Sequence, residues 1–196
     1  MTIPNYNLES TYNDPFMYGS CGGYYRKNKD YIMGASKHYK LKQIINPKPG
    51  DTILLVGAGF GWIAEDWLLS GLGPICAVDT SDWIQNNKNQ HAVIEIHNYD
   101  VTNKTDQLNI KNYLRISSDK KIKWCITEDV FSDCIDSECL LISQHLRNIG
   151  ENIVHYISPP PRSSEILCDR NWKTGTQWKM LLSPDLIFMK GTEVLL

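Results

Sequence analysis

Short apolar runs alternate along this chain with segments in which apolar residues recur every three or four positions. The runs predict strands, which we expect over 52–56, 74–78, 92–97, 123–127 and 152–157, with further strand-like runs over 185–189 and 193–196. The helically spaced segments predict helices over 29–45, 62–70, 82–89, 105–116, 137–148 and 175–182. Strands that alternate with helices are typical of a parallel sheet with right-handed crossovers.

The expected fold class is therefore α/β, a three-layer doubly wound sandwich around a mostly parallel sheet of about seven strands. The uninterrupted aliphatic run over 52–56 suits a strand that is covered on both faces. The last two strands are expected to form an antiparallel edge. A length of 196 residues fits one domain, with a loop or lid over 1–28, a leading helix over 29–46 and the core over 51–196.

Composition and charge narrow the classes of function. Hydrophobic residues make up 42% of the chain and the formal net charge is -2. A disordered chain is excluded by this apolar content, and a general polyanion binder is not expected without a basic excess, although a local basic patch stays open. No apolar run is long enough to span a membrane, and the polar, aromatic start lacks the features of a secretory signal.

The six cysteines point to a reducing environment. None of them forms a CxxC pair, and Cys76 and Cys125 lie inside apolar strand-like runs, where a thiol packs as a small hydrophobe. We therefore expect reduced, buried cysteines, no metal site and a cytoplasmic protein.

The turn over 57–61 is the most informative segment. It follows a predicted strand and precedes a predicted helix, so its glycines allow a ligand to approach the backbone, and the helix start offers unpaired N–H groups. Asp79 ends the next strand, where an acid can accept hydrogen bonds from the two ribose hydroxyls of a nucleoside. The alternative is a plain tight turn, with Asp79 as a helix N-cap.

The spacing of the glycines bears on the cofactor. The dinucleotide fingerprint GxGxxG ends in glycine, whereas this chain follows GxGxG and has Trp62 in the sixth position. A bulky side chain there opposes close packing of helix and strand. The first core strand also begins near residue 52, behind a loop and a helix. Both features count against an oxidoreductase that uses NAD(P) or a flavin.

The arrangement resembles the class I S-adenosylmethionine-dependent methyltransferases, over roughly 29–196 and most specifically over 54–79. The resemblance implies methyl transfer from S-adenosylmethionine, which leaves S-adenosylhomocysteine. It implies that Asp79 binds the ribose, that Asp100 meets the adenine amino group, and that 127–131 borders the methionine part and the substrate. The implied cofactor-binding positions are Gly57, Ala58, Gly59, Phe60, Gly61, Asp79, Thr80, Asp100, Val101 and Glu128.

One position departs from the family pattern. Leu55 stands two residues before the first glycine, where many members carry an acid near the amino group of the cofactor, and Glu128 is our candidate to take that role. Glu128 and Asp129 are the candidate catalytic residues, since a general base helps when the acceptor carries a proton. His97 is a further candidate base. His155 lies in mid-strand and is interpreted as a packed core histidine.

Several alternatives stay open at this stage. Asp100 could instead begin a turn over 100–103. The segment 158–161 is weakly similar to the (D/N/S)PP(Y/F/W) motif of DNA amino-methyltransferases, but Pro161 replaces the aromatic residue and the segment follows the fifth strand rather than the fourth. The aromatic residues of 1–28 could form a lid over the cofactor or a strap over the core.

The length of the chain bears on the acceptor. It leaves little room for a target-recognition domain, which favours a small-molecule acceptor over sequence-specific DNA, with nucleic acid still open. Besides the oxidoreductase, the rival hypothesis is a non-catalytic module that binds a cofactor or a partner, for which Leu55 argues.

Overall fold

The computed structural model of the protein describes residues 36–59, 61–92, 94–128, 130–131, 134–157, 173–189 and 194–195. The predicted loop or lid over 1–28 and the segment 158–161 lie outside these residues. The helices are α4 (Ser36–Ile45), α5 (Trp62–Leu69), α6 (Asp82–His91), α7 (Lys104–Tyr113), α8 (Asp136–Ile149) and α9 (Gly175–Leu182). The strands are β1 (Pro49–Val56), β2 (Gly73–Val78), β3 (Ile96–His97), β4 (Ile122–Glu128), β5 (Gly150–Ile157), β6 (Leu186–Met189) and β7 (Val194–Leu195).

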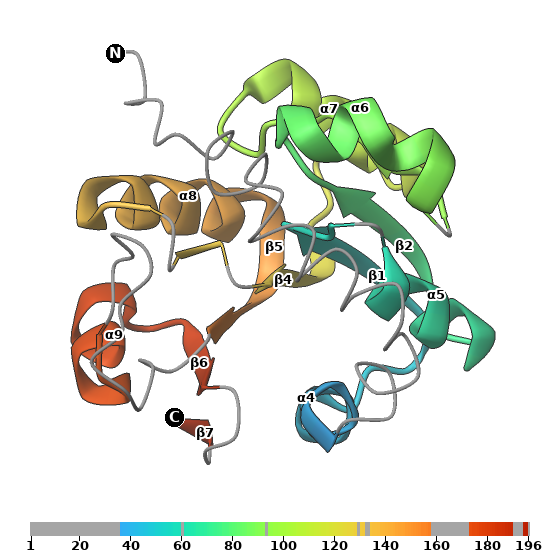
Figure 1. Ribbon diagram of the computed structural model, residues 1–196. Coiled ribbons are helices and arrows are strands. Elements are labelled where there is room, and N and C mark those ends of the chain that lie inside the picture. Colours follow the sequence, from blue (N-terminus) through green and yellow to red (C-terminus); the bar gives the residue numbers. More distant parts are fainter. Residues whose placement is uncertain are drawn as a thin grey trace.

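These strands form one sheet in the order β3-β2-β1-β4-β5-β6-β7 (Figure 1). The six strands from β3 to β6 are parallel, which confirms the predicted α/β class and the mostly parallel sheet. Two described residues of β7 pair antiparallel with β6 and are all that the described chain has of the expected antiparallel edge.

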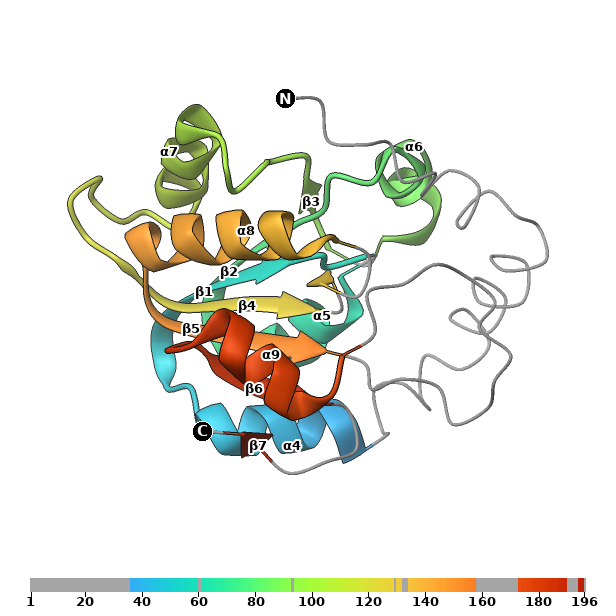
Figure 2. The same cartoon turned by 90° about the vertical axis from the view of Figure 1, so that its left-hand side faces the viewer.

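Helices cover both faces of the sheet, as Figure 2 shows for α7 and α8 on one side and α4 on the other. One core lies under α4, α5 and α6 and includes Leu41, Trp67 and Ile84. The opposite face packs against α7 and α8 through Ile110 and Leu146, and α9 adds Trp178 to a third cluster. Apolar side chains on both faces explain why the central strands are almost continuously aliphatic.

Strand β1 begins at Pro49, three residues earlier than predicted, and two other predicted elements are shorter in the structure. The strand expected over 92–97 is reduced to Ile96–His97, because α6 extends to His91 and the N–H of Ala92 still bonds to the carbonyl of Lys88. The helix expected over 105–116 ends at Tyr113. Arg115 has a φ of 56°, a left-handed conformation that redirects the chain after the helix.

The carboxyl ends of β3, β2, β1 and β4 lie together and form the carboxyl edge of the sheet. Val56 pairs in register with both Val78 and Thr127, and Val78 pairs with His97. The segments that follow these residues therefore leave the sheet side by side. After β1 the chain adds β2 and β3 on one side of this strand, and it then adds β4, β5 and β6 on the other side. Ligands of open α/β sheets bind at such a point.

Candidate functional site

Two glycines of the turn after β1 are required by close packing. Gly57 has a φ of +73°, and a Cβ there would lie 2.9 Å from the carbonyl oxygen of Glu128. Gly61 has a φ of +81°, and a Cβ there would lie 2.4 Å from Cγ1 of Ile94. The turn therefore packs tightly against the end of β4 on one side and against the start of β3 on the other.

Gly59 differs from these two glycines because it borders open space. Its φ is +54°, and apart from its two chain neighbours no atom of the described residues lies within 4 Å of the place where its Cβ would stand. The adjacent helix α5 begins at Trp62, and its N-cap residue, Gly61, has no side chain to cap the first turn. A ligand with hydrogen-bond acceptors can therefore approach the turn and the start of α5 from this side.

Asp79 ties the turn to the end of β2. Its Oδ2 accepts the N–H of Gly59 at 2.9 Å and its Oδ1 accepts the N–H of Ser81 at 2.9 Å. Burial raises the pKa of this carboxyl group to about 6, although both hydrogen bonds favour the ionised form. The N-cap of α6 is Ser81, so the interpretation of Asp79 as that N-cap is wrong. Thr80, the neighbouring predicted position, is exposed.

Asp100 forms the turn that the sequence left open as an alternative. Its Oδ1 accepts both the N–H and the O–H of Thr102 at 2.8 Å, and its carbonyl accepts the N–H of Asn103 at 2.9 Å. Val101 is only 4% exposed and packs into the core beside α7 and α8. It therefore offers no side chain to a ligand.

The segment after β4 adjoins the glycine turn. Glu128 is the last residue of β4 and is partly buried, with its carbonyl oxygen facing Gly57. Ala58 is buried, and its N–H donates to the carbonyl of Val78 at 3.1 Å. Phe60 and Asp129 lie outside the described residues. Among the predicted positions, the structure thus brings Gly57, Gly59, Asp79 and Glu128 to one edge.

Leu55 faces the interior. It is 1% exposed and belongs to the core beneath α4, α5 and α6. A carboxylate in this backbone conformation would be buried among aliphatic side chains, which is costly without a partner. The residue two positions before the first glycine therefore contributes no charge to this site.

The two candidate histidines are packed residues. His97 is stacked on Tyr99 with ring centroids 5.0 Å apart, and it meets Tyr113 in a T-shaped arrangement with ring centroids 4.4 Å apart. Burial lowers the pKa of His97. His155 is fully buried, which confirms it as a core histidine. Its ring nitrogens contact Thr127 and Asp185, two partners that no local sequence pattern indicates.

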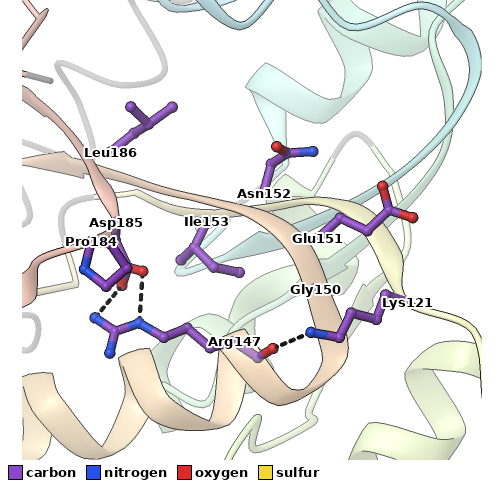
Figure 3. A pocket seen from close by; sticks show the side chains of 9 residues that line it. All are labelled: Lys121, Arg147, Gly150, Glu151, Asn152, Ile153, Pro184, Asp185 and Leu186. Carbon is purple, nitrogen blue, oxygen red and sulfur yellow. Dashed lines mark hydrogen bonds and ion pairs between the residues drawn. The ribbon is translucent and has the colours of Figure 1, made fainter.

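A pocket of about 290 Å³ lies at the opposite edge of the sheet, where β5 and β6 begin (Figure 3). Its polar side chains are largely bonded to neighbours, with Arg147 on Asp185 and Nζ of Lys121 on the carbonyl of Arg147. This pocket contains none of the predicted site residues. Within the described ranges, no three side chains are grouped as metal ligands, and no helix is long and apolar enough to cross a membrane.

Comparisons with known proteins returned structural likeness only. No family model and no curated protein matches the sequence. Magnesium protoporphyrin IX methyltransferase from Synechocystis PCC 6803, solved with bound SAM, is 12% identical with a TM-score of 0.47, over 79% of this chain and 65% of that protein.

Two further solved structures are also of low sequence identity, with TM-scores below 0.5. The plantazolicin methyltransferase BpumL, solved with SAH, is 15% identical with a TM-score of 0.48, over 74% of this chain and 54% of its own. The glycopeptide N-methyltransferase MtfA, solved with SAM, is 12% identical with a TM-score of 0.44, over 60% and 50%. This chain thus spans less than two thirds of each of the three proteins. The fold assignment rests on the strand order and packing described above.

Proposed function

We propose that the protein is an S-adenosylmethionine-dependent methyltransferase that acts on a small-molecule acceptor. The observation that carries the proposal is the surroundings of Gly59. This residue borders open space, and its N–H is bonded to Asp79, at the sheet edge where Glu128 ends β4. The GxGxG spacing supports this cofactor over a dinucleotide, because Gly61 rather than residue 62 is the glycine packed against the β3 side.

The adenosine half fits the acids at this edge. Each carboxylate oxygen of Asp79 accepts one backbone N–H, and each has a further lone pair that a ribose hydroxyl can use. Oδ1 of Asp100 is engaged in its own turn, while Oδ2 accepts no hydrogen bond from the described part of the chain. That oxygen is our candidate for the adenine amino group.

The methionine half is assigned to the end of β4. With Leu55 buried, Glu128 is the charged residue that we assign to the amino group of the cofactor. When bound, the cofactor supplies an electrophilic methyl group. The chain then has to hold the acceptor in line with that group and to accept its proton, for which Glu128 and Asp129 are the candidates.

The acceptor class and the compartment belong to this proposal. A net charge of -2 offers no general attraction for nucleic acid, which favours a small molecule. Cys76, Cys125 and Cys139 are free and buried, which suits the cytoplasm. The second candidate function is a module that binds the cofactor without turnover, and the burial of Leu55 favours it.

Calorimetric titration with S-adenosylmethionine, S-adenosylhomocysteine and NAD tests the proposal. Gly59→Ala and Gly71→Ala form a matched pair, because both residues have positive φ and the described chain places no further residue within 4 Å of either Cβ position, but Gly71 follows the far end of α5. Each substitution should cost about 1 kcal/mol in strain. We expect S-adenosylhomocysteine to bind wild type and Gly71→Ala alike, and Gly59→Ala at least about tenfold more weakly.

The other outcomes discriminate the rivals. Binding of NAD alone would support the oxidoreductase and contradict the proposal. Equal loss of binding in both alanine variants would mean that strain, and not occupation of the site, explains the effect. Binding of S-adenosylmethionine without turnover across a panel of small-molecule acceptors would support the non-catalytic module.

A further inference from the structure

A buried chain of polar side chains lies beneath the segment that follows β4. Oγ1 of Thr127 lies 3.0 Å from Nδ1 of His155, and Nε2 of His155 lies 2.8 Å from Oδ2 of Asp185. Arg147 donates to Asp185 at 2.7 Å, and the hydroxyl of Ser143 donates to the same carboxylate. Thr127 is 1% exposed and His155 is 0% exposed, so the end of this network nearest β4 is shielded from water.

The protonation states of Asp185 and His155 determine which group donates each hydrogen bond. Burial opposes the ionisation of Asp185, but hydrogen bonds from His155, Arg147 and Ser143 outweigh it and lower the pKa of the carboxyl group. Burial lowers the pKa of His155 and favours the neutral ring. Because a carboxylate only accepts, Nε2–H of His155 donates to Asp185, and Nδ1 then accepts the hydroxyl proton of Thr127.

His155 contacts the end of β4 and the segment after it. One contact is the hydrogen bond with the hydroxyl of Thr127, the residue before Glu128. The other is with Phe131, whose ring centroid lies 4.5 Å from that of His155. Between these points, the Glu128 carbonyl and the Val130 side chain face Gly57 so closely that a Cβ there would lie 2.9 and 2.4 Å from them. The segment is thus held from below by His155 and faces the glycine turn.

We propose that His155 is a positioning residue that holds Glu128 and Val130 against the glycine turn through its contacts with Thr127 and Phe131. An apolar side chain could fill the same interior space without the cost of burying polar groups, but it would not fix a direction. The hydrogen bonds to Thr127 and Asp185 fix the orientation of the ring and, through it, the end of β4. The consequence for cofactor binding rests on the function proposed above.

Amide hydrogen exchange, followed by NMR, tests this role without any ligand. Thr127→Val removes the hydroxyl that bonds to His155, and Thr52→Val removes one that accepts the N–H of Lys123 at the other end of β4. We expect exchange of the Glu128, Val130 and Phe131 amides to be about tenfold faster in Thr127→Val than in wild type. Thr52→Val should leave these amides unchanged, and Thr127→Ser should restore the slow rate.

Two results would overturn the proposal. Unchanged exchange at these amides would show that the hydroxyl does not hold the segment, and a uniform acceleration over the whole chain would show general destabilisation. Phe131→Leu removes the other contact while keeping an apolar side chain, so it provides the same readout if Thr127→Val does not fold. Normal exchange in a folded Phe131→Leu would likewise contradict the proposal.

Titration with S-adenosylhomocysteine separates this inference from the proposed function. We expect Thr127→Val to bind it about tenfold more weakly than Thr52→Val does. If wild type does not bind this ligand, the proposed function fails while the exchange result still decides the positioning role. If Thr127→Val exchanges faster but binds as wild type does, the segment is positioned by His155 but does not hold the cofactor.

Discussion

At the scale of single residues, Asp79 combines a structural and a candidate binding role. Its two oxygens connect Gly59 and Ser81, while burial raises its pKa from 3.8 to about 6. The folded protein therefore binds this proton more tightly than the unfolded chain does. The resulting stabilisation is fully present below pH 3.8 and is lost as the pH rises through 6.

This loss of stability with rising pH can be tested on the protein without any ligand. Relative to Asp79→Asn, the free energy of unfolding of wild type should fall between pH 4 and pH 7, by at most about 3 kcal/mol. Urea denaturation of both proteins at four pH values measures the difference. If the free energy of unfolding of wild type instead rises with pH relative to that of Asp79→Asn, the folded protein prefers the ionised carboxylate, and the upward pKa shift of Asp79 is contradicted.

A second residue-scale prediction concerns Gly57. Gly57→Ala and Gly71→Ala place a Cβ at similar positive φ, but only at Gly57 does backbone stand in the way. Gly71→Ala should cost about 1 kcal/mol of stability, and Gly57→Ala should cost roughly 2 kcal/mol more. Equal midpoints of urea denaturation in the two variants would show that the end of β4 does not press against the turn.

At the scale of elements, the N-cap of α7 organises the loop after β3. Oδ1 of Asn103 accepts the N–H of Thr105 at 2.8 Å and that of Asp106 at 3.3 Å, while Asp106 accepts the N–H of Asp100. Asn103→Ala should lower the stability by about 1 kcal/mol, whereas Asn103→Asp should retain it. Thermal denaturation of the pair checks this, and identical midpoints would contradict the capping role.

The elements were predictable wherever local signals agreed with packing. The helix expected over 175–182 is α9, because Thr174 caps it and its residues Trp178 and Leu182 pack into the core. The strand over 52–56 was evident from its aliphatic run. β3 was overestimated because it lies at the edge of the described sheet, where its length depends on pairing with Ala77 and Val78 rather than on its own apolar residues.

At the scale of the whole molecule, two ion pairs should differ sharply in importance. Arg147 and Asp185 join α8 to the start of β6, with the Asp185 side chain 2% exposed, whereas Lys123 and Glu151 are paired on the surface. Asp185→Ala leaves buried donors unpaired and should cost about 3–5 kcal/mol. Glu151→Ala should produce no measurable change. Similar losses in guanidinium denaturation would contradict this ranking.

The site was only partly predictable, because some of its contacts join segments that lie far apart in the sequence. The glycine turn and Asp79 form a local pattern that reads directly from the sequence. The partners of His155, in contrast, lie 28 residues before it in Thr127 and 30 residues after it in Asp185. They come together only when β4, β5 and β6 are aligned, and no local spacing indicates that alignment. The burial of the Val101 side chain likewise depends on its packing beside α7 and α8, which no local pattern indicates.

We propose that the cofactor binds at the carboxyl edge of the sheet, beside Gly59. NMR titration of the labelled protein with S-adenosylhomocysteine examines this site residue by residue. We expect the amide signals of Gly59, Asp79 and Glu128 to shift with one common dissociation constant. Shifts confined to the pocket at the opposite edge, around Gly150 and Asn152, or no saturable shift at all, would contradict it.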